Sequence, residues 1–228
     1  QVFMLSDLDI GMNDWMVSEL TFDDTYRPDR GKVLNTDDLA EMDRFVRYLD
    51  VDGDGIPYRT LPGEDAKGAY FVRGSGHNRY GGYTEDSDEY QDVMDRLLVK
   101  WDTAKRLVPK AILSKAEWKT SIGIVAFGSS DGAVIEARDR LSEQGIHVNY
   151  LRLRSFPFGQ EVIDFLHAHE TVFVVEQNRD AQMKSLLILE TNDIADRLVS
   201  ILHYNGMPIP SDCVVQGVCN HIKSEAAA

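Results

Sequence analysis

The sequence has few cysteines, no long apolar run and no excess of positive charge, and each shortage excludes a class of protein. Cys213 and Cys219 are its only cysteines, six positions apart. They form neither a CxxC metal knuckle nor the four thiolates that an iron–sulfur cluster requires. We predict that both are small buried side chains near a late strand, in a reducing cytoplasm.

The absence of long apolar runs and of basic stripes limits the partners. No run approaches the roughly 20 apolar residues of a membrane helix, and no signal peptide is visible, so we expect no membrane partner. The net charge is −14, and no basic stripe is present that could release counterions from phosphates, so we expect no nucleic acid as a partner. The 228 residues, 43% hydrophobic and 27% charged, are typical of a globular protein of one to one and a half domains.

What is present is organised around a strand–turn–helix–strand pattern. Ile122–Phe127 is an apolar run typical of a strand buried on both faces, and Gly128–Gly132 supplies turn glycines and capping residues. Helical spacing follows, and Gly145 stands where a helix ends. With a second strand at His147–Leu153, this βαβ unit predicts an α/β domain with a parallel sheet.

The remainder of this domain is predicted to alternate in the same way. We expect a helix over Gln160–His169 and a strand over Val172–Val175, with the polar cluster Glu176–Asn178 at the strand's carboxyl tip. Two more helices are expected, one around Met183–Leu187 and one over Ile194–Leu202. His167 and His169 are interpreted as exposed or capping residues and not as ligands.

The N-terminal half is less regular. Because Val2–Leu5 has the pattern of a buried strand directly after Gln1, we expect the chain to begin within a domain. The polar loop Ser6–Asn13 is then either a site at a strand's carboxyl end or a cap for the next segment. Further expectations are a helix over Thr36–Leu49, a brief strand over Ala69–Val72 and a long helix over Asp88–Val108.

An acidic turn follows the predicted helix that begins at Thr36. Asp50, Asp52 and Asp54 occupy positions one, three and five of an EF-hand-like loop, where hard oxygen ligands surround calcium. The match then fails, because Pro57 and Leu61 stand where the exit helix and its bidentate glutamate belong. Two interpretations stay open, a calcium or magnesium site and a solvated acidic turn.

The most glycine-rich stretch is Arg73–Tyr83. Its glycines allow close approach of backbone to another surface, and His77, Asn78 and Arg79 could meet an anion there. The stretch is neither a dinucleotide fingerprint nor a Walker loop, so we assign no nucleotide to it. A structural and a functional interpretation remain equally open.

Four stretches carry a resemblance to a known family. Val2–Trp15, Asp52–Gly63 and Arg73–Asn78 resemble the end of the pyrimidine-type domain in the α subunit of 2-oxoacid:ferredoxin oxidoreductases, most closely of the 2-oxoglutarate type. Val174–Met183 is similar to the strand and helix of the family's transketolase C-terminal-like domain. The implied fold is α/β, the end of a pyrimidine-type thiamine-enzyme domain followed by a transketolase C-terminal-like parallel-sheet domain.

The resemblance implies domains at 1–87 and 120–223, a linker helix over 88–119 and a tail over 224–228. It also implies a complex that decarboxylates a 2-oxoacid on thiamine diphosphate, reduces ferredoxin and forms acyl-coenzyme A. Thiamine diphosphate, magnesium and a 4Fe–4S cluster are expected on the β subunit, and no cofactor on this chain alone. The expected partners are that β subunit and the N-terminal part of the α subunit, with ferredoxin and coenzyme A acting through the complex.

No catalytic residue transfers from the family. Its substrate-loop motif, its glycine-rich loop and its pyrimidine-contacting glutamate precede the point where this chain starts, so we expect the chain to be inert alone. His77, Asn78 and Arg79 are the candidates for a substrate or interface loop, and Asp50, Asp52 and Asp54 for a metal. The alternative is a non-catalytic acidic α/β interaction or regulatory module, with calcium as one ligand considered.

Overall fold

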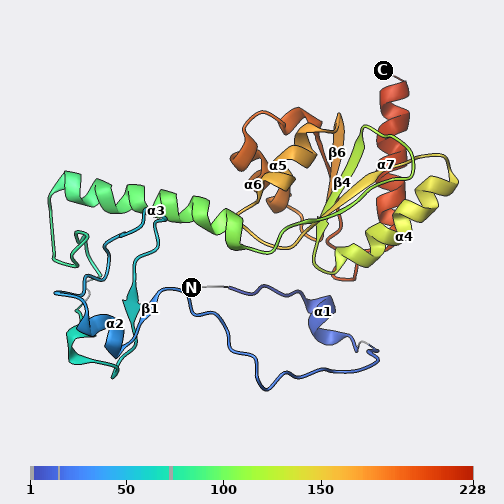
Figure 1. Ribbon diagram of the computed structural model, residues 1–228. Helices are drawn as coiled ribbons and strands as arrows, with labels where there is room; N and C mark the ends of the chain where they lie inside the picture. Colours follow the sequence, from blue (N-terminus) through green and yellow to red (C-terminus); the bar gives the residue numbers. More distant parts are fainter. Residues whose placement is uncertain (1–2, 15, 72–73, 228) are drawn as a thin grey trace. The chain divides into compact units, whose positions relative to one another are not determined.

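The computed structural model describes residues 3–14, 16–71 and 74–227 and divides into two compact units. The first, here called the sheet unit, comprises residues 1–16 and 108–228. The second, here called the loop unit, comprises residues 17–107. Figure 1 labels the elements of both, and each unit is described by itself.

A five-stranded sheet forms the centre of the sheet unit. The strands lie in the order β3-β5-β4-β6-β7. Their bounds are β3 Ile112–Ser114, β4 Ile122–Phe127, β5 Asn149–Leu153, β6 Thr171–Glu176 and β7 Leu198–Leu202. All neighbours pair in parallel except β3, which runs antiparallel to β5 at one edge. The predicted α/β class with a mainly parallel sheet is confirmed.

Helices cover both faces of this sheet (Figure 1). They are α4 Ser130–Glu143, α5 Gln160–His167, α6 Gln182–Thr191 and α7 Ser211–Ala226. Because successive strand residues point to opposite faces, Ile124 and Ala126 pack under α4 and α7, whereas Val125 packs under α5 and α6. Burial on both faces explains the uninterrupted apolar run of β4.

The predicted βαβ unit is confirmed in detail. Strand β4, helix α4 and strand β5 follow in the expected order, and Gly145 has a φ of +78°, the left-handed conformation that glycine adopts most readily. Strand β6 and the first helix after it, α6, also confirm their predictions.

Two segments of the sheet unit differ from expectation. Ile194–Leu202 is a short 3-10 turn, η2 Ala195–Arg197, followed by strand β7, and not a helix. Ile112–Ser114, expected within the linker, is edge strand β3. Short apolar runs fit the spacing of a helix and that of a strand equally well. Both segments are strands here because β7 pairs with β6 and β3 pairs with β5.

The loop unit has a small core and one long helix. Its elements are β1 Val33–Leu34, α2 Thr36–Ala40, β2 Arg59–Thr60, the 3-10 turn η1 Ala66–Gly68 and α3 Ser87–Leu107. Strands β1 and β2 pair in parallel, and Leu34, Leu39 and Phe45 form a cluster. Helix α3 confirms its prediction.

The predicted helix from Thr36 to Leu49 is wrong beyond Ala40. Asn35 and Asp38 form a reciprocal capping box that starts α2, but the helix has only five residues. Phe45 is buried all the same, so the apolar stripe that suggested a longer helix serves the core from irregular backbone. Ala69–Phe71 is likewise not a strand, and Val72 lies outside the described residues.

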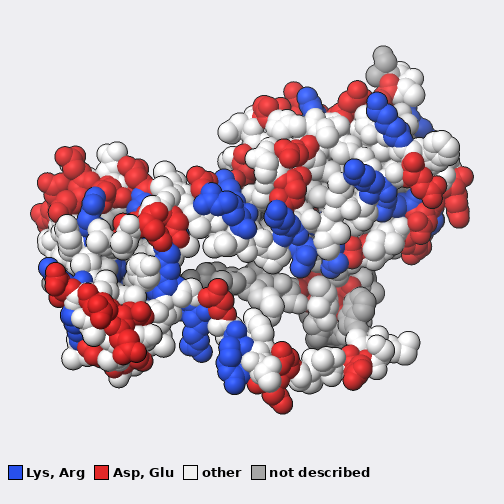
Figure 2. Space-filling view, viewed as in Figure 1, with Lys and Arg blue, Asp and Glu red and all other residues white. Residues whose placement is uncertain are grey.

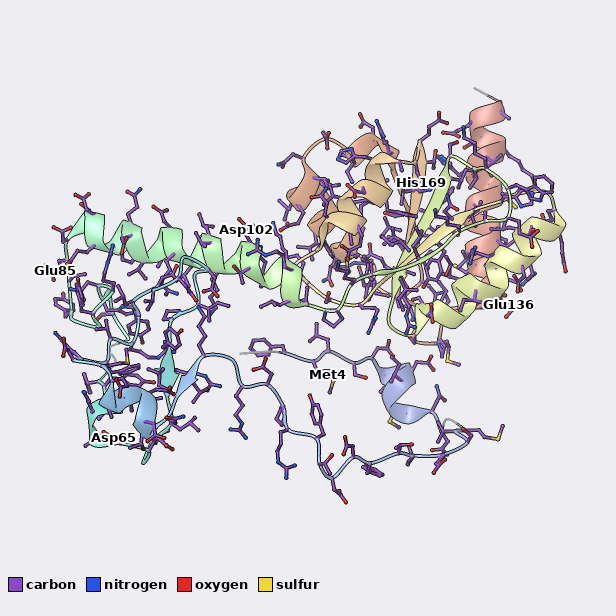
Figure 3. All side chains as sticks on the ribbon, viewed as in Figure 1. Met4, Asp65, Glu85, Asp102, Glu136 and His169 are labelled. Atoms are coloured by element: carbon purple, nitrogen blue, oxygen red, sulfur yellow. The ribbon has the colours of Figure 1, made fainter. Side chains whose placement is uncertain are left out.

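The N-terminal segment also differs from expectation. Phe3, Met4 and Leu5 belong to no strand and are more than 80% exposed, so the predicted buried strand is wrong there, and Val2 lies outside the described residues. Figure 3 labels Met4 in this segment. The polar loop contains a short helix, α1 Leu8–Met12. Within the described part of the chain, no helix is long and apolar enough to cross a membrane.

Candidate functional site

The first candidate for a ligand site lies in the sheet unit, at the point where the connections between strands change direction. From β4 the chain moves through α4 to β5 on one side, and then crosses through α5 to β6 on the other side of β4. In open α/β sheets, ligands bind outside the carboxyl ends of the strands at such a switch point. Here the loops that follow β4 and β6 meet there.

Gln177 joins these two loops. Its Nε2 donates hydrogen bonds to Ser129 Oγ at 2.9 Å and Ser130 Oγ at 3.2 Å, and its Oε1 accepts from the Ile209 N–H at 3.2 Å. The side chain therefore connects the β4 loop, the β6 loop and the segment before α7.

Asp7 brings the N-terminal segment to the same point. Its Oδ2 accepts a hydrogen bond from the Ser129 N–H at 2.9 Å, next to the start of α4, and its Oδ1 caps α1 through the Ile10 N–H at 2.9 Å. Burial by itself raises the pKa of the Asp7 carboxyl, but these hydrogen bonds outweigh it and lower that pKa. Gly128 has a φ of +60°, and a Cβ there would stand 2.7 Å from Asp7 Oδ2.

Glu176, at the end of β6, is fully buried and fully occupied. Its carboxylate accepts hydrogen bonds from the Met183 N–H at 2.7 Å, the Lys184 N–H at 3.0 Å and Asn178 Nδ2 at 2.8 Å. Two of these donors are N–H groups of the first turn of α6, which lack partners within the helix. Within the polar cluster Glu176–Asn178, Glu176 therefore caps the start of α6, and Gln177 connects neighbouring loops.

Asp131 anchors the first turn of α4 to β5. It accepts a hydrogen bond from Tyr150 Oη at 2.8 Å and pairs with Arg152 Nη1 at 3.1 Å. Burial, followed by the bond to Asp131, raises the pKa of the Tyr150 hydroxyl far above its ordinary value, so this tyrosine stays protonated. In the described residues around this switch point, the polar groups hold loops in place and form no nucleophile–base pair.

The glycine-rich loop in the loop unit is held by α3. Asn78 Oδ1 accepts from the Tyr80 and Gly82 N–H groups at 3.0 Å each, and Asn78 Nδ2 donates to Glu89 on α3. Arg79 Nε donates to Asp92 Oδ2 at 3.1 Å. Figure 2 shows carboxylates gathered around the start of α3, where the nearby acidic residues are Glu85, Asp86, Asp88 and Glu89.

His77 completes this loop. Its ring stacks on Tyr48 with 4.1 Å between the ring centroids, and its Nδ1 lies 3.0 Å from the Asn78 carbonyl oxygen. The structure thus brings His77, Asn78 and Arg79 together in one ordered turn, with Arg79 exposed at the surface. Their role as a substrate or interface loop stays a prediction.

The acidic turn gathers the three predicted carboxylates around a cation that the chain itself provides. Ligand oxygens of Asp50, Asp52 and Asp54 lie within 4.8 Å of one another. Lys32 Nζ lies 2.6 Å from Asp52 Oδ1, 2.7 Å from Asp54 Oδ1 and 3.0 Å from the Ile56 carbonyl oxygen. The sequence pattern of residues 50–61 could not predict this contact, because Lys32 lies 18 positions before Asp50.

The pKa shifts of Lys32 and Asp52 are those expected of an ion pair within the chain. Burial by itself lowers the pKa of Lys32, but its hydrogen bonds to Asp52 and Asp54 raise that pKa overall. The hydrogen bond from Lys32 lowers the pKa of the Asp52 carboxyl. Asp50 is occupied separately, because it accepts from the Gly53 and Gly55 N–H groups at 3.0 and 2.9 Å. These contacts favour an acidic turn in which Lys32 bridges Asp52 and Asp54 over a metal site.

The predictions for the histidines and the cysteines are confirmed only in part. His167 is exposed, as predicted, but His169 is buried, with Nδ1 2.6 Å from the Phe165 carbonyl oxygen and Nε2 2.9 Å from Asn149 Nδ2. The predicted exposure of His169 is therefore wrong, whereas the predicted capping role fits the contact of Nδ1 with a carbonyl in the last turn of α5; Figure 3 labels His169. Cys213 and Cys219 are free and only partly buried, and they lie on α7.

The residues that sequence reasoning missed are those whose partners lie far along the chain. Asp7 lies 122 positions from Ser129, and Lys32 lies 20 positions from Asp52. Of the two polar clusters predicted at strand ends, Ser6–Asn13 and Glu176–Asn178, only the second follows a strand, β6. Their junction at Ser129 came only from the fold.

Comparisons with known proteins agree on one family of relatives. The chain is 32% identical over 187 residues to the 2-oxoacid:ferredoxin oxidoreductase 2 α subunit of Aeropyrum pernix, covering 80% of this chain and 27% of the relative. It is 26% identical over 197 residues to the 2-oxoacid:ferredoxin oxidoreductase α subunit of Saccharolobus solfataricus, covering 84% of this chain and 30% of the relative. No protein-family model matches the sequence.

A solved structure shares the fold. The 2-oxoglutarate:ferredoxin oxidoreductase from Magnetococcus marinus, solved with 2-oxoglutarate, coenzyme A and succinyl-coenzyme A bound, matches 78% of this chain and 30% of its own, with a TM-score of 0.66 and 21% identity. The resemblance to 2-oxoacid:ferredoxin oxidoreductase α subunits is thereby confirmed over most of the chain, which spans about a third of the length of these relatives.

Proposed function

We propose that this chain, a relative of 2-oxoacid:ferredoxin oxidoreductase α subunits, forms part of such a subunit in a working complex. The complex decarboxylates a 2-oxoacid on thiamine diphosphate, passes electrons through an iron–sulfur cluster to ferredoxin and forms acyl-coenzyme A. The observation that carries the proposal is the 32% identity over 80% of the chain to an α subunit. Two unpaired thiols, Cys213 and Cys219, support a reducing cytoplasm as its compartment.

Within the complex, the proposed contribution of this chain is placement and not chemistry. The two cysteines are too few for a 4Fe–4S cluster, and Lys32 fills the position between the carboxylates of Asp52 and Asp54. The chain's residues therefore do not fit the cluster or magnesium, and we assign both, with thiamine diphosphate, to the β subunit. Alone, the chain is inert.

The proposed 2-oxoacid is 2-oxoglutarate. Asp52–Gly63 and Arg73–Asn78 resemble the 2-oxoglutarate type, and the Magnetococcus marinus enzyme that shares the fold holds 2-oxoglutarate and succinyl-coenzyme A. The loop of His77, Asn78 and Arg79 is proposed to face a subunit seam, since its contacts with Tyr48 and α3 hold it in one conformation before any partner arrives.

An anaerobic affinity purification from source extract tests the proposal. The tagged chain is the bait, and mass spectrometry identifies its partners. A bait carrying Ile124→Asp, which places a charge in the fully buried sheet core, is the matched control for capture that depends on the fold. We expect a thiamine diphosphate and iron–sulfur β subunit with the folded bait alone.

The recovered complex is then assayed for coenzyme A-dependent reduction of an artificial electron acceptor, with 2-oxoglutarate and pyruvate compared. A preference for 2-oxoglutarate supports the substrate, and a preference for pyruvate corrects it without removing the family. Recovery of partners unrelated to thiamine enzymes would instead support the alternative, a non-catalytic acidic α/β interaction module.

A further inference from the structure

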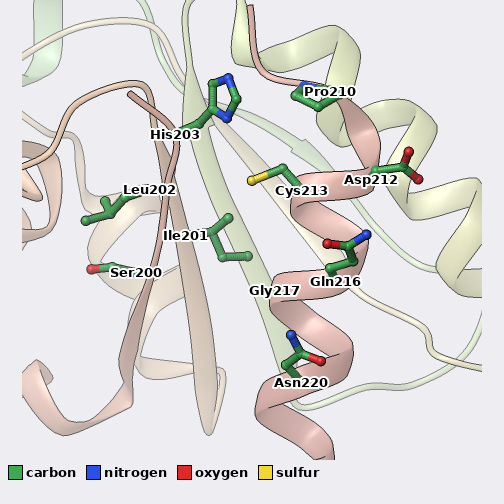
Figure 4. A pocket seen from close by; sticks show the side chains of 10 residues that line it. All are labelled: Ser200, Ile201, Leu202, His203, Pro210, Asp212, Cys213, Gln216, Gly217 and Asn220. Atoms are coloured by element: carbon green, nitrogen blue, oxygen red, sulfur yellow. The ribbon is translucent and has the colours of Figure 1, made fainter. Parts of the chain in front are cut away.

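A groove runs along the free edge of the sheet unit beside β7. Its volume is about 440 Å³, and its lining includes Ser200, Ile201 and Leu202 of β7 and Gln216, Gly217 and Asn220 of α7. Figure 4 shows β7 on one side and α7 on the other. Gly217 lets α7 approach closely, because a Cβ there would lie 2.8 Å from Ile201 Cγ1.

The backbone of β7 has hydrogen-bonding groups to offer at this edge. Leu202 lies opposite Glu176 of β6, but it is His203 whose N–H donates to the Glu176 carbonyl oxygen, at 2.9 Å. Since backbone groups alternate between the two sides of a strand, Ser200 and Leu202 direct theirs away from β6. Within the described chain, no strand pairs with that side.

The two edges of the sheet are protected to different degrees. Strand β3 has only three residues and is flanked by Lys110 and Lys115, which are devices that discourage pairing with another chain. Strand β7 has five residues, Leu-Val-Ser-Ile-Leu, with no charge, proline or bulge. A hydrophobic edge of this kind is a template for a further strand.

Two amide side chains on α7 face the same groove. Gln216 and Asn220 are exposed and four positions apart, so they share a face of the helix. Neither amide side chain has a hydrogen-bond partner among the described residues. Their rise along α7 is about 6 Å, close to the roughly 6.6 Å between alternate residues of a strand.

The lining of the groove carries no unpaired charge, and this favours an uncharged ligand. Its one carboxylate, Asp212, is already paired with Arg140 on α4, so the lining presents unpaired amides and backbone groups without an uncompensated charge. We propose that this groove binds an extended, uncharged segment of a partner polypeptide, which adds a sixth strand to β7 while Gln216 and Asn220 bind its alternate residues. The inference is independent of the proposed catalytic function.

Peptide selection on the full chain tests this proposal. Random phage-displayed peptides of roughly eight residues, an ordinary strand length, are selected on the immobilised chain, and the enriched peptides are synthesised and titrated by fluorescence anisotropy. Ser200→Pro removes an outward N–H that β6 does not use, which edge strands tolerate. We expect this variant, and the double variant Gln216→Ala with Asn220→Ala, to weaken binding roughly tenfold or more.

Gln91→Ala, the same truncation of an exposed amide on α3, is the matched control and is expected to bind as the unmodified chain does. Retained binding in the double variant, or failure to enrich any peptide, overturns the proposal. A concentration-dependent dimer that Ser200→Pro dissociates also overturns it, because the occupant is then a second copy. The double variant keeps β7 unaltered, so the test stands even where the proline impairs folding.

Discussion

At the scale of single residues, Lys32 shows how a side chain can take the position of a metal ion. Its ammonium nitrogen lies within 3.0 Å of oxygens from Asp52, Asp54 and Ile56. A hard divalent cation prefers such oxygen ligands, and Lys32 competes with it as a cation already attached to the chain.

Replacing this lysine should therefore expose a weak metal site. We predict that Lys32→Met lowers the Tm by roughly 2–4 °C, because it leaves the clustered carboxylates without their cation, and that millimolar calcium restores part of the loss. Differential scanning fluorimetry with and without calcium measures both effects. Lys67→Met, at an exposed lysine outside the cluster, should change neither, and a calcium response in the unmodified chain would contradict the assignment.

Asp7 is the second residue with a role that depends on its charge. We predict that Asp7→Asn speeds hydrogen exchange in Ser6–Asn13, because the amide accepts more weakly from the Ser129 and Ile10 N–H groups than the carboxylate does. Exchange mass spectrometry of this peptide measures the change. Asp14→Asn, at an exposed position beyond α1, is the control and should leave the protection unaltered.

The same contact has a defined pH dependence. Because the pKa of Asp7 in the folded chain lies below its ordinary value of 3.8, its contribution to stability is present above that value and is lost as the pH falls through the lowered pKa. The Ser129 amide resonance in heteronuclear NMR spectra should be constant from neutral pH to about pH 4 and shift only below it. A midpoint above the ordinary value would contradict the contact.

At the scale of elements, the acidic turn and α3 act as one structure. Arg96 Nη1 donates to the Gly55 carbonyl oxygen at 2.8 Å, and Thr103 Oγ1 donates to the Asp54 carbonyl oxygen at 2.7 Å. Gly55 makes this approach possible, since a Cβ there would stand 2.3 Å from the Lys100 backbone nitrogen.

Two glycines of the turn separate backbone strain from steric contact. Gly53 and Gly55 both have a φ of +78°, but a Cβ on Gly53 would meet nothing within 4 Å. We predict that Gly53→Ala costs about 1 kcal/mol, the strain of a left-handed alanine, and that Gly55→Ala costs about 3 kcal/mol or more, because α3 must also move. Chemical denaturation of the two variants compares them, and equal losses would show that α3 does not contact the turn.

For the molecule as a whole, a further prediction concerns the proposed oxidoreductase complex. We predict that His77→Ala lowers its turnover several-fold and leaves the subunits associated, because the ring orders a loop proposed to lie at a subunit seam. Steady-state kinetics and size-exclusion chromatography of the complex measure the two effects. His147→Ala, on the sheet unit, is the control; unchanged kinetics in His77→Ala would remove this loop from the active-site approach.

Local patterns were sufficient for much of the sheet unit. Strand β4, helix α4, strand β5 and the left-handed Gly145 follow from apolar runs, helical spacing and a glycine at a helix end, all of which depend on residues close in sequence. The long motifs likewise carried the resemblance to oxidoreductase α subunits. Strand β7 was missed because Leu198 and Ile201 also fit a helical stripe.

Local patterns and motifs were therefore sufficient for the α/β class, the βαβ unit and the family resemblance. The folded structure was needed to find that Lys32 bridges Asp52 and Asp54, that Asp7 accepts a hydrogen bond from Ser129 and that His169 is buried against Asn149. Each of these contacts joins residues far apart in the chain. Periodicity and capping report neighbours within a few residues, whereas ion pairs and long-range hydrogen bonds depend on where the packed sheet and loops place their partners.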